Sequence, residues 1–208
     1  NVYSIKPKHS SYYYTEVTKK KCICMHFTIG YILSDIDALT KVDNHVSVSY
    51  VVDRGGRIYE LFNDKYWSYH LGKGTVGGNE IMSKQTIGIE ISNYGPLKNV
   101  KGNMVDIYDG IYCSEDEFAF YEEIPFRENQ YFASMTERQI ISTAALLNHL
   151  SKKHGIALDF KLDEKVFAND AEARAYNGIF THANVRKDKS DWPMSESYNA
   201  LVERTKDL

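Results

Sequence analysis

The sequence predicts an α/β fold in which helices flank a central, mostly mixed β-sheet. Apolar runs at residues 21–28 and 85–92 have the length and composition of buried strands. Two β-rich stretches around a Gly-Gly turn predict a hairpin over residues 45–62. A longer segment that begins near residue 136 has a helical period. Strands interspersed with helices favour a sheet that helices cover.

Glu90 distinguishes the second apolar strand from the first. The strand is apolar at nearly every other position, which is typical of a central strand buried on both faces. The first strand ends in His26-Phe27-Thr28. Each of the two predicted central strands therefore carries, near its end, one side chain that can bind a metal or transfer a proton, His26 or Glu90.

Three helices are expected. The longest begins at the capping box Thr136-Glu-Arg-Gln139 and ends at Gly155, which supplies the C-terminal stop. Its apolar stripe consists of Ile140, Ala144, Leu147 and Leu150. Shorter helices are expected at residues 35–42 and 195–204.

The 208 residues are expected to form one domain over 1–208, because this length suffices for a substantial core. The polar, tyrosine-rich residues 1–20 are interpreted as an N-terminal extension. Residues 93–134 are rich in aromatic and polar side chains without a clean period, so they are predicted to form an extended insertion or a long loop. Such a segment often borders a binding site.

Charge and hydropathy exclude two classes of partner. The net charge is −3 and no long Lys/Arg block is present, so nucleic acid is not expected. No apolar segment reaches the roughly 18–20 residues of a membrane span. The N-terminus shows no signal-peptide pattern, and the localisation stays undetermined. A monomer is the favoured oligomeric state.

The three cysteines do not suggest a disulfide framework. Cys22 and Cys24 lie two apart on a predicted strand, where their side chains point the same way but are poorly placed to bond each other. Cys24 shares a face with His26, so it is a minor candidate for a further metal ligand. The commoner alternative is a small buried side chain beneath the site.

His26, His182 and Asp191 are the candidate ligands of one zinc ion per chain. His26 ends a buried strand, and the other two lie nine positions apart where a strand runs into a polar loop. Three protein ligands leave one tetrahedral position open, and zinc lowers the pKa of water from about 15.7 to about 7. Such a centre generates a nucleophile at neutral pH.

Lys189 and Glu90 are the candidate catalytic residues. A lysine beside a metal-binding carboxylate has no evident structural purpose, since its charge opposes the cation, but it suits an oxyanion that forms during acyl transfer. Burial of Glu90 would raise its pKa into the range of a general base. The structural alternative for Glu90 is an ion pair at a sheet edge.

His70 and Trp67 are the candidate substrate-binding residues. Both belong to the loop segment Tyr66-Trp-Ser-Tyr-His-Leu-Gly72, in which a histidine stands among aromatic side chains. Substrate contact and simple packing are equally compatible with this composition.

Five separated motifs together resemble the zinc-dependent N-acetylmuramoyl-L-alanine amidases, the type shared with bacteriophage lysozyme-amidases and peptidoglycan recognition proteins. They keep the family's order over about residues 20 to 200 and are His26-Phe-Thr28, Ser47 to Tyr59, Trp67-Ser-Tyr-His-Leu-Gly72, Ile87-Gly-Ile-Glu90 and His182 with Lys189-Ser-Asp191. The resemblance implies a single domain with this family's fold. It also implies zinc ligands at His26, His182 and Asp191, an acid/base at Glu90 and a transition-state lysine at Lys189.

The implied reaction is cleavage of the amide between the lactyl group of N-acetylmuramic acid and L-alanine of the peptidoglycan stem peptide, in cell-wall lysis or remodelling. The sequence departs from the family at three places. Val48 stands where some members have a tyrosine, Phe27 replaces a second histidine, and Asp191-Trp-Pro193 replaces Asp-Pro-Gly.

Two other functions compete with this interpretation. A non-catalytic peptidoglycan-binding module of the same fold would generally lack the third ligand, whereas Asp191 and Lys189 are both present. A zinc peptidase acting on another peptide is the second alternative, but the chain contains no His-Glu-x-x-His helix.

Overall fold

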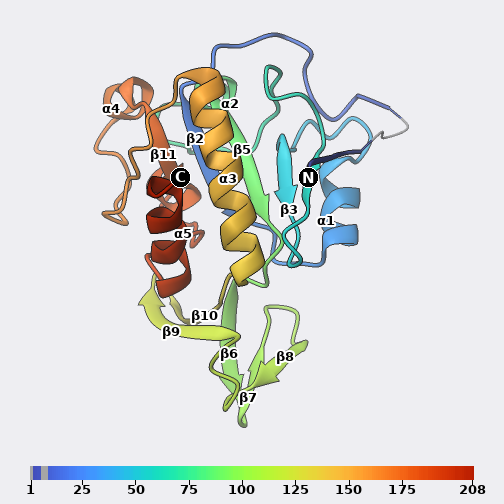
Figure 1. Cartoon of the computed structure of the whole chain (residues 1–208), viewed down its shortest axis with the longest axis vertical. Helices are drawn as coiled ribbons and strands as arrows, with labels where there is room; N and C mark the ends of the chain where they lie inside the picture. The colour runs from blue at the N-terminus through green and yellow to red at the C-terminus, as the bar shows by residue number, and fades with distance from the viewer. Residues whose placement is uncertain (1, 6–8) are drawn as a thin grey trace.

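The computed structural model describes residues 2–5 and 9–208, and its main body is a six-stranded sheet between helices (Figure 1). The strand order is β1-β4-β3-β5-β2-β11. The strands are β1 (Val2–Ser4), β2 (Cys22–Phe27), β3 (Tyr50–Val52), β4 (Ile58–Glu60), β5 (Thr86–Ile91) and β11 (Gly178–Thr181). Only the β3–β4 hairpin is antiparallel among these pairs, so the sheet is mixed, as predicted.

Strands β2 and β5 form the buried centre of the sheet. Every residue of β2 is buried, and β5 pairs with β2 on one side and β3 on the other. Because side chains alternate along a strand, Ile23 and Ile89 face one apolar core, whereas His26 and Glu90 face the opposite side. The predicted central strands and hairpin are therefore confirmed.

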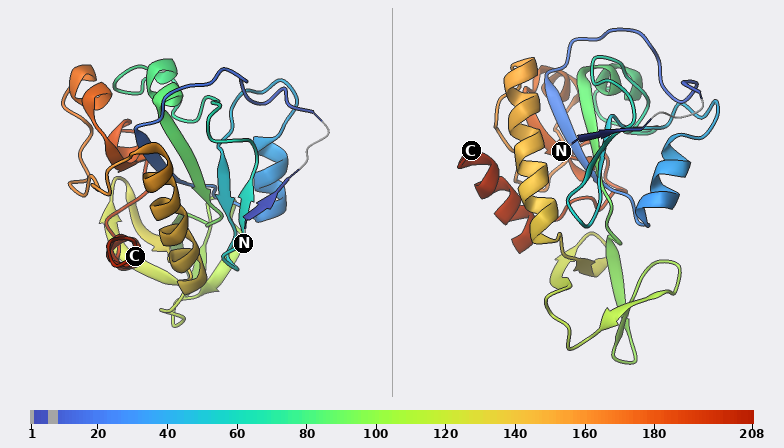
Figure 2. Two further views of the ribbon diagram at one scale, coloured as in Figure 1. Left: turned by 45° about the horizontal axis from the view of Figure 1, so that its top comes forward. Right: turned by 45° about the vertical axis from the view of Figure 1, so that its right-hand side comes forward.

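Helices α3 (Glu137–His154) and α5 (Glu196–Lys206) pack together on the apolar core face of the sheet (Figure 2, right). The predicted capping box of α3 is present, and Gly155 adopts the left-handed conformation that ends the helix. Helix α1 (Ile32–Leu39) lies on the other side of the sheet and begins three residues before the predicted start. Its N-cap, Tyr31, makes no side-chain capping bond, so the sequence contained no start signal.

Two short helices escaped prediction. They are α2 (Asn79–Gln85) and α4 (Asp170–Ala175), and a 3₁₀ turn, η1 (His182–Asn184), follows β11. Within the described ranges, no helix combines the length and apolar character that crossing a bilayer requires. The three cysteines are free and buried.

The segment 93–134 forms a second, antiparallel sheet that projects from the main body (Figure 1). Its order is β8-β7-β6-β10-β9, with β6 (Pro96–Val100), β7 (Asn103–Val105), β8 (Ile111–Ser114), β9 (Tyr121–Phe126) and β10 (Asn129–Ala133). The alternative of a long loop was therefore wrong. Strands of three to six residues are too short to show a period, and they close a small core around Met104 and Tyr121.

The N-terminal extension partly joins the main body. Val2–Ser4 pairs in parallel with β4, and Tyr12 is almost fully buried, with its hydroxyl donating to the carbonyl of Leu61. This segment therefore completes one edge of the sheet.

Candidate metal centre and active site

The carboxyl ends of β2, β5 and β11 bring the candidate residues together. These three strands are parallel neighbours, so their ends meet at one edge of the sheet. His26 lies near the end of β2 in register with Glu90 of β5, and His182 directly follows β11. Asp191 is held beside this edge because the Ala183 amide donates to the Asp191 carbonyl.

Three side-chain atoms that could bind a metal ion converge at this edge. The Nδ1 atoms of His26 and His182 lie 3.0 Å apart, and each lies 3.3 Å from Oδ2 of Asp191. All three side chains are buried. We refer to His26, His182 and Asp191 as the metal triad.

The outer nitrogens of both histidines are already occupied. His26 Nε2 lies 3.0 Å from Nδ1 of His70, and His182 Nε2 lies 2.8 Å from the Leu71 carbonyl. A proton on Nε2 of His182 satisfies that carbonyl and leaves the Nδ1 lone pair facing the triad. Outer partners of this kind fix the tautomer and orientation of metal-binding histidines.

Charge in the triad also suits a cation. Burial and the neighbouring His182 lower the pKa of His26 to about 4, so His26 is neutral at pH 7. Burial opposes ionisation of Asp191, but His182 and His26 outweigh it and hold the Asp191 pKa well below its usual range. A neutral imidazole and an ionised carboxylate are the protonation states in which histidine and aspartate bind metals.

Cys24 belongs to a different group. Its sulfur lies within 4.8 Å of the ligand atoms of His26 and His70, whereas the triad is formed without it. Burial raises the pKa of the Cys24 thiol well above its usual value, which disfavours the thiolate that a metal would need. This placement supports the interpretation of Cys24 as a small buried side chain beneath the site.

Glu90 lies beside the triad as a partly exposed side chain, but its Oε2 atom is buried. Its Oε2 has no hydrogen-bond partner among the described residues. Burial, followed by the nearby Asp191 and Asp35 charges, raises the pKa of Glu90 well above its usual value, and Lys189 opposes this shift. A carboxyl group whose pKa is raised in this way is suited to general acid–base catalysis.

Of the remaining candidate residues, His70 and Lys189 share a hollow with a triad residue, whereas Trp67 does not line it. His70 and Lys189 line one hollow together with His182. Trp67 is buried elsewhere: its ring stacks on Tyr14 at 4.3 Å, and its Nε1 donates to Glu16. It is not among the described residues that line this hollow, so its packing gives no support to a role in substrate binding.

Two departures from the family pattern contact each other. The ring of Phe27 packs edge-on against Trp192, with centroids 5.1 Å apart, and Trp192 is 1% exposed. Trp192 also stacks on Tyr198 of α5. The residue after Asp191 is therefore anchored in the core, which fixes the end of the loop that carries Asp191.

Three contributors to the site were missed at the sequence level. The Leu71 carbonyl is a backbone group and has no sequence signal. Asp35 is buried near Glu90 and accepts a hydrogen bond from Ser92 at 2.7 Å. Arg127 of the second sheet donates to the carbonyls of Ala183 and Lys189, and only the fold brings it there.

The chain is similar to known proteins in its sequence profile and in its fold. The family profile described as N-acetylmuramoyl-L-alanine amidase matches residues 16–193. No curated protein sequence matches the chain.

Several solved structures share the fold. The Escherichia coli amidase AmiD, in complex with anhydro-N-acetylmuramic acid-L-Ala-D-γ-Glu-L-Lys, has a TM-score of 0.59 at 19% identity, covering 91% of this chain and 59% of that one. LysC of Clostridium intestinale has a TM-score of 0.55 at 13% identity, covering 99% and 97%. AmiA of Staphylococcus aureus has a TM-score of 0.55 at 15% identity, covering 99% and 81%. This chain thus spans 59% of the length of AmiD.

Proposed function

Because the chain belongs to the N-acetylmuramoyl-L-alanine amidase family, we propose that it hydrolyses the amide between the lactyl group of N-acetylmuramic acid and L-alanine in peptidoglycan. The observation that carries the proposal is the convergence of His26, His182 and Asp191 on one point. This arrangement supports an enzyme over a binding module, because a module needs no complete set of metal-binding side chains beside a partly buried acid.

Zinc is the metal that this donor set fits. Ligand atoms about 2.0–2.1 Å from a tetrahedral zinc are separated by roughly 3.3–3.4 Å, close to the distances within the triad. Two imidazoles and one carboxylate are also ligands that catalytic zinc uses. Bound here, zinc would act as a Lewis acid and make water acidic enough to attack near neutral pH.

Glu90 and Lys189 supply the remaining chemistry. We assign Glu90 the proton transfers: its carboxylate takes a proton from the attacking water and gives it to the nitrogen of the leaving L-alanine as the C–N bond breaks. The ammonium of Lys189 holds the negative charge that develops on the carbonyl oxygen. The products are a free lactyl carboxylate and a free peptide amine.

Mass spectrometry of purified peptidoglycan after incubation with the metal-loaded protein tests this function. We expect free stem peptides and glycan chains that retain intact lactyl groups, together with about one zinc per chain. His182→Ala should abolish both the products and stoichiometric zinc. Products cut at another bond, or full activity after complete zinc removal, would contradict the proposal.

A further inference from the structure

The outer partners of both triad histidines are consecutive residues of one loop. Nδ1 of His70 lies 3.0 Å from Nε2 of His26. The carbonyl oxygen of Leu71 lies 2.8 Å from Nε2 of His182. Because outer partners fix the tautomer and orientation of metal-binding histidines, the position of this loop affects both rings at once. We call residues 67–71 the support loop.

The support loop contains no helix and no strand of its own. Two isolated bridges hold its backbone: Trp67 pairs with Tyr14, and Tyr69 pairs with Val46. Segments with few backbone hydrogen bonds open locally at a low cost in free energy. The order of the support loop therefore depends on the segments that it contacts.

Residues 12–18 of the N-terminal extension contact one side of the support loop, and we call them the strap. The Tyr14 amide donates to the Trp67 carbonyl at 2.8 Å, and the Trp67 amide donates to the Tyr14 carbonyl at 3.3 Å. The Ser68 hydroxyl lies 2.9 Å from the carbonyl oxygen of Tyr12. Two consecutive residues of the support loop are thus bonded to the strap.

The side chain of Trp67 adds contacts to the strap and to α2. Its ring stacks on Tyr14 with centroids 4.3 Å apart, and its Nε1 donates to Glu16 at 3.0 Å. Nζ of Lys84, in α2, lies 4.9 Å from the centre of the Trp67 ring and 3.1 Å from the Glu16 carboxylate. Trp67 is 5% exposed, so one buried ring joins the strap, the support loop and α2.

Resting on the proposed function, in which the triad holds zinc, we propose that the strap positions the support loop for zinc binding. Tyr14 and Trp67 are then positioning residues, which act on the metal through His70 and Leu71. Tyr14 precedes the part of the chain that the family profile matches, residues 16–193. One partner of the central stack therefore comes from outside the matched segment.

The strap should be worth less than a complete outer partner. Loss of an outer partner typically lowers metal affinity by about 10–100-fold. Residues 45–47 hold the support loop from another segment, because the Tyr69 amide donates to the His45 carbonyl and the Ser47 amide donates to the Tyr69 carbonyl. Apparent affinity falls in proportion to the fraction of molecules with an ordered loop, so loosening the strap should cost about 3–10-fold.

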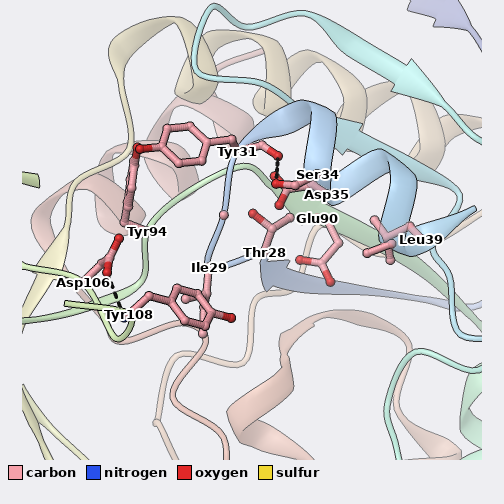
Figure 3. Close-up of a pocket in the computed structure, with 12 residues that line it drawn as sticks. Thr28, Ile29, Tyr31, Ser34, Asp35, Leu39, Glu90, Tyr94, Asp106 and Tyr108 are labelled. Atoms are coloured by element: carbon pink, nitrogen blue, oxygen red, sulfur yellow. Dashed lines mark hydrogen bonds between the residues drawn. The ribbon is translucent and has the colours of Figure 1, made fainter. Parts of the chain in front are cut away.

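The acid–base side of the site does not depend on the strap. Glu90 lines a hollow of about 460 Å³ beside α1, together with Tyr31 and Tyr94 (Figure 3). No residue of the strap or of the support loop is among the described residues that line this hollow. A loosened strap should therefore lower zinc affinity while turnover at saturating zinc stays near that of the wild type.

Tyr14→Ala, which removes the ring stacked on Trp67, tests the proposal. We expect zinc affinity, measured by competition with a chromogenic chelator, to fall by about 3–10-fold. In the metal-free protein, amide hydrogen exchange over residues 67–71 should become faster, while β2 and β5 keep their protection. Unchanged zinc affinity would overturn the proposal, even if exchange over the support loop became faster. Loss of protection in β2 and β5 would also overturn it, because Tyr14 would then act on the whole fold.

Two tyrosine variants serve as controls. Tyr14→Phe keeps the stacked ring and should bind zinc like the wild type. Tyr3→Ala removes another tyrosine of the N-terminal extension, whose ring packs against Tyr59 of β4, and should leave zinc affinity unchanged. Slower turnover of Tyr14→Ala at saturating zinc, with unchanged affinity, would indicate a contact with substrate and reject the positioning role.

A second pair of variants isolates the hydrogen bond of Trp67. Glu16 and Glu80 both pair with Lys84, at 3.1 and 3.0 Å, but Nε1 of Trp67 donates to Glu16. Glu16→Ala should weaken zinc binding by about 2-fold, whereas Glu80→Ala should not change it. Equal effects of the two variants would assign the result to the charge of Lys84 and count against the proposal.

The role of the strap and the proposed function can fail separately. Zinc affinity and amide exchange are measured without peptidoglycan, so the predicted pattern in a protein that leaves the amide intact would support the strap and reject the proposed function. Amide hydrolysis by a protein whose zinc affinity is unchanged in Tyr14→Ala would reject the role of the strap alone.

Discussion

The roles proposed for Glu90 and Lys189 concern different parts of one reaction, so the loss of each side chain should have a different kinetic signature. Glu90→Gln keeps the size of the side chain but cannot accept a proton, so we expect zinc to stay bound while turnover falls by roughly 10²–10⁴. Lys189→Met removes one oxyanion donor and should lower turnover by about 10²–10³. The acid limb of the pH–rate profile should change shape only for Glu90→Gln. Near-full activity of Glu90→Gln would show that another group serves as the base.

His70 is expected to support the metal because its Nδ1 lies 3.0 Å from Nε2 of His26. His70→Ala removes this outer partner and should lower zinc affinity by about 10–100-fold, measured by competition with a chromogenic chelator. His149→Ala, which removes an exposed histidine of α3, should leave the affinity unchanged. Unchanged zinc affinity with slower turnover in His70→Ala would instead indicate substrate contact.

Sequence motifs could identify the triad residues but not the atoms they use. His26 and His182 are 156 residues apart, and the parallel pairing of β2 with β11 brings their rings together. The assignment of Nδ1 to the triad depends on what each Nε2 contacts, including the Leu71 carbonyl. A backbone carbonyl is common to every residue type, so this contact has no counterpart in the sequence.

At the scale of elements, prediction succeeded where the pattern is local. The capping box and stripe of α3 span neighbouring turns of one helix, and the apolar runs of β2 and β5 are continuous. The second sheet has no such continuous pattern. Its turns contain Gly102 and Gly110, but the strands between them have only three to six residues, too few to show a period.

Arg127 couples the second sheet to the loop that leads from His182 to Asp191. Its guanidinium donates to the carbonyls of Ala183 and Lys189 at 3.2 and 3.3 Å. Arg127→Ala should loosen residues 183–191, which raises amide hydrogen exchange there and lowers zinc affinity, while the central strands keep their protection. Arg127→Lys can make fewer of these bonds and should give an intermediate result. Unchanged exchange over 183–191 in Arg127→Ala would show that the loop is held without the second sheet.

At the scale of the whole molecule, the feature that the sequence did not predict is a buried lysine, Lys20. Lys20 stands between Lys19 and Lys21 in a segment that reads as a polar extension, yet it is 2% exposed. Its Nζ donates to the Lys84 carbonyl at the end of α2. Its burial arises from the packing of the N-terminal segment against the sheet, which no local pattern encodes.

The buried Lys20 should make the stability of the protein depend on pH. Burial lowers the Lys20 pKa from its ordinary 10.5 to about 7, against the attraction of Asp64 and Glu16. Between these values the unfolded chain holds a proton that the folded protein has lost, so the contribution of Lys20 to stability rises with pH and is lost as the pH falls towards 7.

Lys20→Met, which removes the titrating group but keeps an unbranched side chain, tests this dependence. Urea unfolding at pH 7 to 9.5 should show the free energy of unfolding of the wild type rising relative to Lys20→Met, by up to about 1.4 kcal/mol per pH unit. Lys19→Met changes an exposed neighbour and should run parallel to the wild type. Because other titrations, including those of the tyrosines, occur in all three proteins, they cancel in the differences. Parallel curves for the wild type and Lys20→Met would show that Lys20 keeps its proton in the folded protein, with water or a carboxylate within reach of its Nζ.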